Sequence, residues 1–246
     1  DRAVHVRGGR RDEVGRGADR TEGRHACRHG RRRRPVLERG RGLGRAGADI
    51  QLHRHERVDR HDLDSAAPLA HGLLAQGAKV IDVGTGAGFP GMPLLILRPD
   101  LQITFLDALN KRILFLEDAL KRLGLTAATL HARAEDAAKM AAHREQYDAA
   151  VSRAVANAAT LEELTLPFVK KGGVAIAWKG PGVADELTAA RRAAFLLGGT
   201  VRGTVDAPIP RRADWAHVLL LTDKTGTTPK AYPRKAGTPG KKPLGM

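Results

Sequence analysis

The sequence contains a single cysteine, few aromatic residues and no long apolar run. Cys27 is alone among 246 residues, so no disulfide can form within the chain, and a reducing compartment fits. No apolar segment approaches the roughly 20 residues that span a bilayer. Charges interrupt the N-terminal segment, where a signal peptide would need an apolar core. We therefore expect a soluble, cytoplasmic protein with no membrane partner.

Lysine is missing from residues 1–60, and no aromatic residue occurs before Phe89. Residues 1–60 carry a net charge of +9, residues 61–223 are neutral and residues 224–246 carry +6, so the formal charge of +15 lies at the two ends. Basic ends usually meet a polyanion, and nucleic acid is the first candidate. Solvated charge that aids solubility is the alternative.

Arginine and glycine fill 25 of the first 50 positions, and the apolar residues there show neither helical nor strand period. Such a stretch cannot bury enough surface to offset its chain entropy, so we expect disorder in residues 1–60. One interpretation is an arginine-rich RNA-binding arm centred on residues 31–34. The other, which we favour, is a GC-rich gene read out of frame. An uninterrupted genomic frame through codons 1–60 would contradict it.

Short apolar runs alternate with amphipathic stretches from about residue 79 onward. The pattern predicts strands at residues 79–83, 102–107, 129–131, 147–152 and 173–178, and helices at 90–98, 110–123, from 135, 159–168 and 185–197. Asn110 is expected to cap its helix, which Gly124 ends, and the inward face comprises Ile113, Leu116, Leu120 and Leu123.

Two final strands, 200–206 and 217–222, are joined by a Pro-rich turn without a helix. The order predicts an α/β fold: a mostly parallel, doubly wound sheet with an antiparallel edge strand. This ending favours a Rossmann-like class I methyltransferase, because dinucleotide dehydrogenases continue with further βα units. The expected domain is 61–223, followed by a basic tail at 224–246.

The glycine-rich segment 82–91 follows the first strand and fits two cofactor patterns. Residues 86–91 match the dinucleotide fingerprint G-x-G-x-x-G, whereas Asp82 with Gly84, Gly86 and Gly88 matches the methyltransferase loop. Asp82 favours the second, because a carboxylate there can reach the cationic amino group of S-adenosylmethionine, directly or through water. Pro90 removes an N–H that a pyrophosphate site could use. A glycine turn without a ligand is the remaining alternative.

One acidic residue ends the second strand, and another follows the third. Asp107 could accept hydrogen bonds from ribose hydroxyls in either cofactor class, or it could cap the following helix. Ala134 offers a backbone N–H and Glu135 a carboxylate at the place where adenine is usually held. Taken alone, Glu135 is more often an acid in the first turn of a helix, where the dipole stabilises it.

The fourth strand ends at Ser152-Arg153-Ala154, where the methyl acceptor is expected. The Pro-Pro-aromatic signature of exocyclic-amine methylases is missing, and Cys27 is the sole residue that could serve a cytosine-C5 mechanism. A ring nitrogen such as guanine N7 needs no general base, and alignment alone can supply roughly 7–11 kcal/mol. Arg153 could orient the cofactor carboxylate or a substrate phosphate, or form a structural ion pair.

Several motifs together resemble the RsmG (GidB) family, bacterial methyltransferases that act on guanine N7 of 16S rRNA at nucleotide 527. They are residues 82–91, 106–113, 133–135, 152–156, 179–180, 228–234 and 237–244. The resemblance covers about residues 61–246. It implies S-adenosylmethionine as cofactor, 16S rRNA or the small ribosomal subunit as partner, and cofactor contacts at Gly84, Phe89, Ala134, Glu135 and Arg153, with Asp107 on the ribose.

The basic tail suits contact with RNA phosphates, through Lys230, Arg234, Lys235, Lys241 and Lys242, with Tyr232 among them for stacking. The chain departs from the family at its N-terminal end, where only residues 61–65 match, and this supports the frame hypothesis. We expect a monomer without a metal ion. The alternatives are a non-catalytic RNA- or ribosome-binding module and, less favoured, an NAD-dependent oxidoreductase.

Overall fold

The computed structural model describes residues 63–153, 156–207 and 217–246. The Arg/Gly-rich segment, Ala154 and most of the expected Pro-rich turn lie outside the described residues. The elements are α2 (Ala67–Ala70), β1 (Lys79–Val83), α3 (Gly91–Leu97), β2 (Gln102–Asp107), α4 (Asn110–Leu123), β3 (Ala128–His131), α5 (Ala134–Ala137), β4 (Tyr147–Arg153), α6 (Ala158–Thr165), the 3-10 helix η2 (Leu166–Phe168), β5 (Val169–Lys179), α7 (Val183–Leu196), β6 (Gly199–Asp206), β7 (Val218–Lys224) and α8 (Thr238–Lys241).

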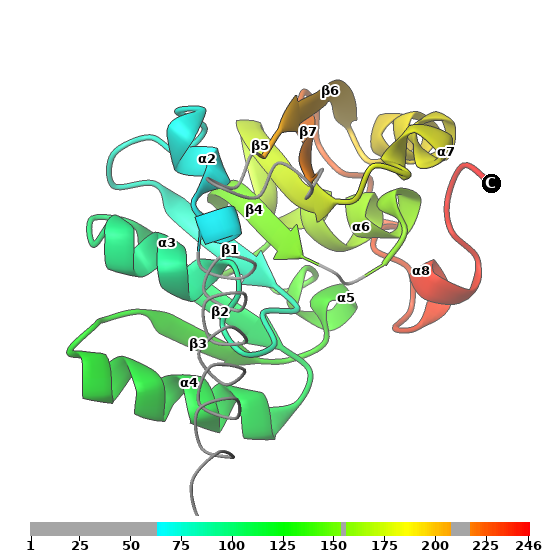
Figure 1. Ribbon diagram of the computed structural model, residues 1–246. Coiled ribbons are helices and arrows are strands. Elements are labelled where there is room, and N and C mark those ends of the chain that lie inside the picture. Colours follow the sequence, from blue (N-terminus) through cyan, green and yellow to red (C-terminus); the bar gives the residue numbers. More distant parts are fainter. Residues whose placement is uncertain (1–62, 154–155, 208–216) are drawn as a thin grey trace, which may run out of the picture. The chain divides into compact units, whose positions relative to one another are not determined.

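The seven strands form one sheet in the order β3-β2-β1-β4-β5-β7-β6 (Figure 1). The pairs from β3 to β5 are parallel, whereas β7 is antiparallel to both β5 and β6. The mostly parallel α/β sheet with an antiparallel end is therefore confirmed. The reversed strand is β7, which lies between β5 and the edge strand β6. The order reverses between β1 and β4, which is where ligands bind in doubly wound sheets.

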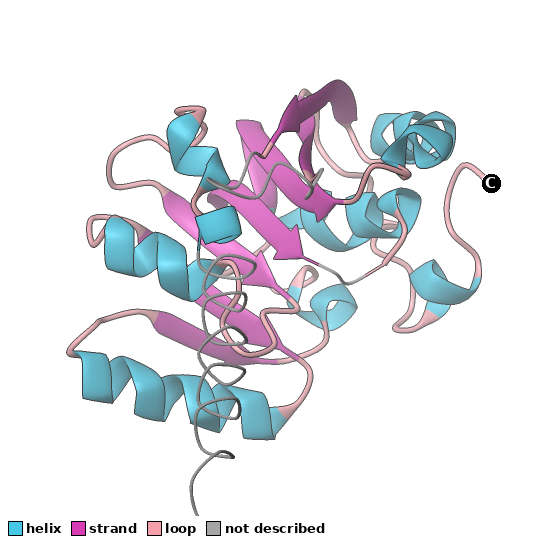
Figure 2. Cartoon of the chain, viewed as in Figure 1, coloured by secondary structure: helices cyan, strands magenta, loops and turns pink. Residues whose placement is uncertain are grey.

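Alternate residues of the strands supply two cores on opposite faces of the sheet, because successive side chains point to opposite sides. Val80 belongs to the core that α3 and α4 cover. Ile81 and Val83 belong to the other, which is built with residues of α5, η2 and α7. Helices accordingly cover both faces of the sheet (Figure 2). Because helices pack on the faces, we expect a ligand to bind at the carboxyl ends of the parallel strands.

Two expectations about α4 are wrong in detail. Asn110 is its first helical residue rather than its cap, and Leu109 occupies the cap position. The Asp107 carboxylate accepts the Leu109 N–H at 2.8 Å, so Asp107 provides the side-chain acceptor. Leu123 is 55% exposed, although the other three predicted inward residues are buried. Leu125, which follows the Gly124 turn, packs against the core instead.

Candidate functional site

The loop between β1 and α3 is held against the end of β2 by its backbone. The N–H groups of Gly84 and Thr85 both donate to the carbonyl of Leu106, at 2.9 and 3.1 Å. Gly84 and Gly86 have φ values of +72° and +62°, which other residues rarely adopt. The Gly86 N–H donates to Asp107 Oδ2 at 3.0 Å. The glycines thus let the chain turn sharply over two strand ends, with its backbone close to the space above the sheet.

Asp82 lies beneath this loop and is fully buried. Its Oδ2 accepts hydrogen bonds from the Thr85 hydroxyl at 2.6 Å and the Gly91 N–H at 2.9 Å. Burial raises the pKa of Asp82 to about 7, more than these two hydrogen bonds lower it. The carboxyl group therefore ties together the two ends of the loop. It does not line the cavity above, where we had expected it to reach a cationic amino group.

Gly88 and Gly91 serve the packing of α3. A Cβ at Gly88 would lie 2.9 Å from Cδ2 of Leu116, and Gly88 has a φ of +100°. A Cβ at Gly91 would lie 2.6 Å from the Phe105 ring and 2.8 Å from Asp82 Oδ2. Gly88 thus allows close packing against α4, and Gly91 brings α3 close to β1 and β2 of the sheet. Gly88, like Asp82, is absent from the lining of the cavity.

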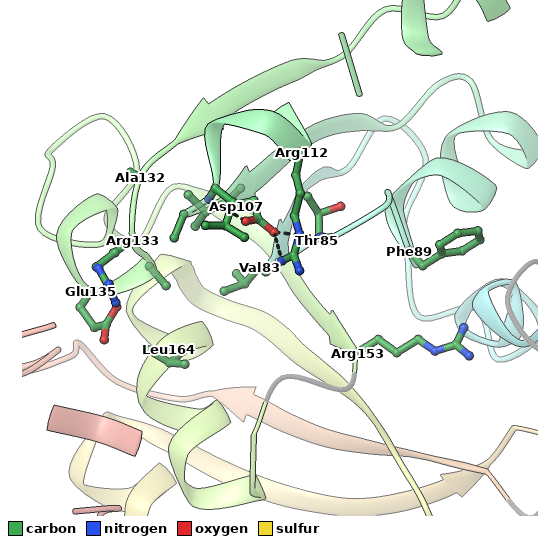
Figure 3. A pocket seen from close by; sticks show the side chains of 16 residues that line it. Val83, Thr85, Phe89, Asp107, Arg112, Ala132, Arg133, Glu135, Arg153 and Leu164 are labelled. Carbon is green, nitrogen blue, oxygen red and sulfur yellow. Dashed lines mark hydrogen bonds and ion pairs between the residues drawn. The ribbon is translucent and has the colours of Figure 1, made fainter. Parts of the chain in front are cut away.

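A cavity of about 540 Å³ opens above the carboxyl ends of β1, β2 and β4. This volume lies within the range of pockets that hold small molecules. Seven of the nine predicted cofactor residues line it: Gly84, Gly86, Phe89, Asp107, Ala134, Glu135 and Arg153. Figure 3 shows Arg133 and Glu135 at one side of the cavity, Asp107 near its middle, and Phe89 and Arg153 at the other side. Residues from four separate loops therefore surround one space.

The Asp107 carboxylate is the main fixed negative group near the middle of the cavity. It is 3% exposed, and its Oδ2 accepts both the Gly86 N–H and an Arg112 N–H at 3.1 Å. Both roles considered for Asp107 are compatible with this geometry, because it supports the start of α4 and also lines the cavity. Three donors thus fix the orientation of this carboxylate where it borders the cavity.

Arg153 ends β4 and lies on the boundary between two cavities. Its Nη2 lies 3.3 Å from Oδ2 of Asp64, and the side chain of Asp64 is fully buried. Arg153 also lines a second cavity of about 360 Å³ with Asp64, Trp178, Lys179 and His217, among other residues. The ion pair that we considered for Arg153 is therefore present, and the same side chain borders the cofactor cavity.

The second cavity contains a histidine–carboxylate pair that was not predicted from the sequence. His217 Nδ1 lies 3.1 Å from Asp64 Oδ2, although 153 positions separate the two residues. The Trp178 indole N–H donates to the Asp64 carbonyl at 3.0 Å. Only the His-x-x-Asp-Ser motif at 61–65 gave a signal for Asp64. Nothing local in the sequence marked His217, because its partner comes from the other end of the domain.

Nine further residues line the first cavity and were not predicted: Val83, Thr85, Leu106, Ala108, Leu109, Arg112, Ala132, Arg133 and Leu164. Thr85 and Arg133 lie inside motifs that were recognised, so their positions could have indicated them. Leu164 lies on α6, which carried no motif, and only the packing of α6 beside α5 brings it to the cavity.

The predicted RNA-contacting residues divide into two groups. Lys230, Lys235, Lys241 and Lys242 are exposed. Arg234 is instead engaged with Glu163, whose side chain is fully buried, through Nη2 to Oε2 at 2.5 Å. Tyr232 packs partly buried against the core. Four of the five cations are therefore available to a partner, while Arg234 has a structural bond.

Within the described ranges, no group of three or more His, Cys, Asp or Glu side chains could hold a metal ion. In the same ranges, no helix is both long and apolar enough to cross a membrane.

The strand order, the glycine loop after β1 and the acidic residue that ends β2 define a class I S-adenosylmethionine-dependent methyltransferase. The fit of this cofactor rests on the glycine loop and on the preorganised Asp107 carboxylate in the cavity. Among solved structures, the fold resembles that of the cyclase SpnF (TM-score 0.50, 15% identity, 66% of this chain and 81% of that one). It also resembles a structure described in connection with the conversion of a disulfide bond into a thioacetal group during echinomycin biosynthesis (TM-score 0.51, 18% identity, 65% and 81%).

Comparison with known families gives a match over residues 49–211 to GidB, rRNA small subunit methyltransferase G. Ribosomal RNA small subunit methyltransferase G of Clostridium novyi is 46% identical over 190 residues, 77% of this chain and 78% of its own length. The protein of the same name from Lactobacillus delbrueckii subsp. bulgaricus is 46% identical over 188 residues, 75% and 78%. The chain belongs to the rRNA small subunit methyltransferase G (GidB) family. The match begins at residue 49, inside the segment in which we had found no family motif.

Proposed function

We propose that this chain transfers a methyl group to N7 of a guanine in 16S rRNA, at nucleotide 527. Its relatives are named as methyltransferases of small-subunit ribosomal RNA. The base, the atom and the nucleotide number go beyond those names and rest on the motif resemblance and on the chemistry of the site. The observation that carries the proposal is the second cavity beside the cofactor cavity, with Arg153 in the lining of both.

The position of Arg153 supports an in-line transfer between the two cavities. S-adenosylmethionine supplies an electrophilic methyl group when it is bound. A nucleophile has to approach that carbon from the side opposite the sulfur, so the acceptor must enter from an adjoining space. Both cavities have Arg153 in their lining, at the end of β4, which is where the class places its acceptor.

The second cavity presents a ring and several cationic donors to an acceptor base. Trp178 offers an aromatic wall, and Arg153, Lys179 and His217 offer N–H groups. Guanine carries two acceptors, O6 and N7, on one edge, and Arg and Lys are the side chains that most often recognise this edge. A donor to O6 would orient the base while N7 keeps its lone pair for the methyl group. Such a reaction needs alignment and no proton transfer.

The Asp64–His217 pair could also accept a proton, and a proton acceptor would suit an exocyclic amine or a hydroxyl group. The two chemistries predict different effects of His217→Asn. General-base catalysis contributes about 10²–10⁴-fold to a rate. If His217 is a base, its loss should therefore slow single turnover at least about 100-fold. Methylation at N7 should slow by less than about 10-fold, and the rate should stay flat between pH 7 and pH 9.

The decisive experiment incubates the full chain with methyl-labelled S-adenosylmethionine and either 30S subunits or naked 16S rRNA from a strain that lacks this modification. The RNA is then treated with borohydride and aniline, which cleave the strand at 7-methylguanine. Label together with cleavage at nucleotide 527 is expected. Label without cleavage would contradict N7 as the acceptor. Binding of RNA without any label would favour the non-catalytic RNA-binding module, and binding of NADH in place of S-adenosylmethionine would favour the oxidoreductase.

A further inference from the structure

Lys224 is the last residue of β7, so the C-terminal tail of the structure comprises residues 225–246, and bonds to its backbone fasten it to the methyltransferase domain. The Arg144 guanidinium donates to the carbonyls of Thr228 at 2.8 Å and of Tyr232 at 2.9 Å. Glu145 Oε1 accepts the Thr228 N–H at 2.7 Å. The fully buried Lys224 ammonium lies 3.1 Å from the same Glu145 oxygen. Because these partners come from the segment before β4, the start of the tail has a defined place on the domain.

Glu163 of α6 fixes the middle of the tail. Its Oε1 accepts the backbone N–H of Arg234 at 2.8 Å and the Arg234 Nε–H at 2.9 Å. Arg234 Nη2 also donates to the carbonyl of Lys242 at 2.7 Å, which closes the tail on itself. Charge-assisted, bidentate bonds of this kind are among the strongest hydrogen bonds in proteins. The four exposed lysines of the tail are therefore carried on a backbone that the domain holds in place.

Glu135 joins the tail to the cofactor cavity. It lines the cavity, is 8% exposed, and accepts the Gly237 N–H on Oε1 at 2.7 Å. Gly237 is the N-cap residue of α8, and α8 packs on α6, where the Thr160 hydroxyl donates to the Pro239 carbonyl at 3.1 Å. One carboxylate thus contacts both the cavity and the segment that carries Lys241 and Lys242. Among the described residues, no hydrogen bond is made to its second oxygen, Oε2.

We propose that Glu135 couples the two binding events, so that the cofactor and a polyanionic RNA strand bind with positive cooperativity. This inference rests on the proposed function. A cofactor donor that bonds to Oε2 restrains the Glu135 side chain, and a restrained carboxylate holds the Gly237 N–H more firmly. Lys241, the last residue of α8, and Lys242, which follows it, are then presented to RNA phosphates at a lower cost in entropy. Linkage requires that RNA tighten cofactor binding by the same factor.

The test is a thermodynamic cycle with the full chain at one salt concentration, because salt alone changes RNA affinity. Calorimetry gives the dissociation constant of S-adenosylmethionine with and without saturating 16S rRNA. Filter binding gives the dissociation constant of the RNA with and without saturating S-adenosylmethionine. We expect each ligand to tighten the other about fivefold, at the lower end of typical coupling factors. A factor of one, with both ligands bound, would overturn the coupling and leave the proposed function intact. Failure to bind either ligand would overturn both.

Three variants separate the link from simple loss of binding. Glu163→Gln loosens the tail without changing a residue of the cavity. It should leave cofactor affinity without RNA within twofold of wild type and reduce the coupling factor to below twofold. Lys241→Ala is the matched control, because it should weaken RNA binding with and without cofactor and keep the factor near five. Glu135→Gln keeps an oxygen that can accept the Gly237 N–H but removes the negative charge at the cavity lining. This variant should also abolish the coupling. Retention of fivefold coupling in Glu163→Gln and Glu135→Gln would refute the role of Glu135.

Discussion

The buried Asp82 makes the stability of the protein depend on pH in a direction opposite to that of most acids. Its pKa is raised by burial to about 7, from 3.8. Between these two values the folded chain holds a proton that the unfolded chain releases. Stability linked to Asp82 is therefore full below pH 3.8 and is lost as pH rises toward 7. Above pH 7 the folded and unfolded chains are both ionised, and the loss stops growing.

Asp82→Asn replaces the titratable carboxyl group with a neutral amide, whose oxygen can still accept hydrogen bonds from the Thr85 hydroxyl and the Gly91 N–H. Between pH 5 and pH 7 the wild-type protein loses about 1.4 kcal/mol of its free energy of unfolding per pH unit through Asp82, which is about 3 kcal/mol over the two units. Relative to wild type, the variant should therefore gain about 3 kcal/mol in free energy of unfolding when the pH is raised from 5 to 8.

Urea denaturation at pH 5 and pH 8, extrapolated to water, measures this double difference. Asp118→Asn is a suitable control, since Asp118 is an exposed acid on α4 whose removal should have the same effect at both pH values. An equal difference between Asp82→Asn and wild type at pH 5 and pH 8 would refute the reasoning, because it would mean that Asp82 is ionised throughout.

Three further predictions concern the second buried acid, the loop and the tail. Burial raises the pKa of Glu162 to about 8, so Glu162→Gln should also gain stability relative to wild type between pH 5 and pH 8, measured in the same way. Gly86→Val should abolish S-adenosylmethionine binding in calorimetry. Valine is strained at the backbone φ of +62° that Gly86 adopts, and it adds a branched side chain to the cavity lining. A dissociation constant within threefold of wild type would contradict this prediction. Arg234→Ala should lower the free energy of unfolding by about 3–5 kcal/mol, because it leaves the buried Glu163 charge unpaired. The control Lys230→Ala should change the free energy of unfolding by less than about 0.5 kcal/mol. Equal effects of the two substitutions would refute the division of the tail into anchoring and exposed cations.

The sequence predicted what depends on local pattern. Apolar runs located β1 and β2 to the residue, and the glycine loop located the cofactor cavity, because each signal lies within a few consecutive residues. The position of β7 between β5 and β6 could not be obtained in this way, since strand order is set by packing across the whole sheet.

Contacts between distant segments were also beyond the sequence. His217 meets Asp64 across 153 positions, and Arg234 meets Glu163 across 71. A basic residue in a basic tail gives no sign that it is bound to a buried acid, so Arg234 was grouped with the lysines. Asp82 was placed correctly at the end of β1, but its burial beneath the loop depends on how Gly91 and Thr85 close over it.

The place of β7 in the sheet has a consequence for the order in which the protein can fold. During synthesis β6 is made before β7, and in the finished sheet β6 pairs only with β7. Until residues 218–224 are available, β5 has an open edge and β6 has no partner. Unpaired strands of this kind invite pairing with other chains. A chain that stops short of β7 should therefore aggregate, even though its cofactor loop and parallel strands are complete.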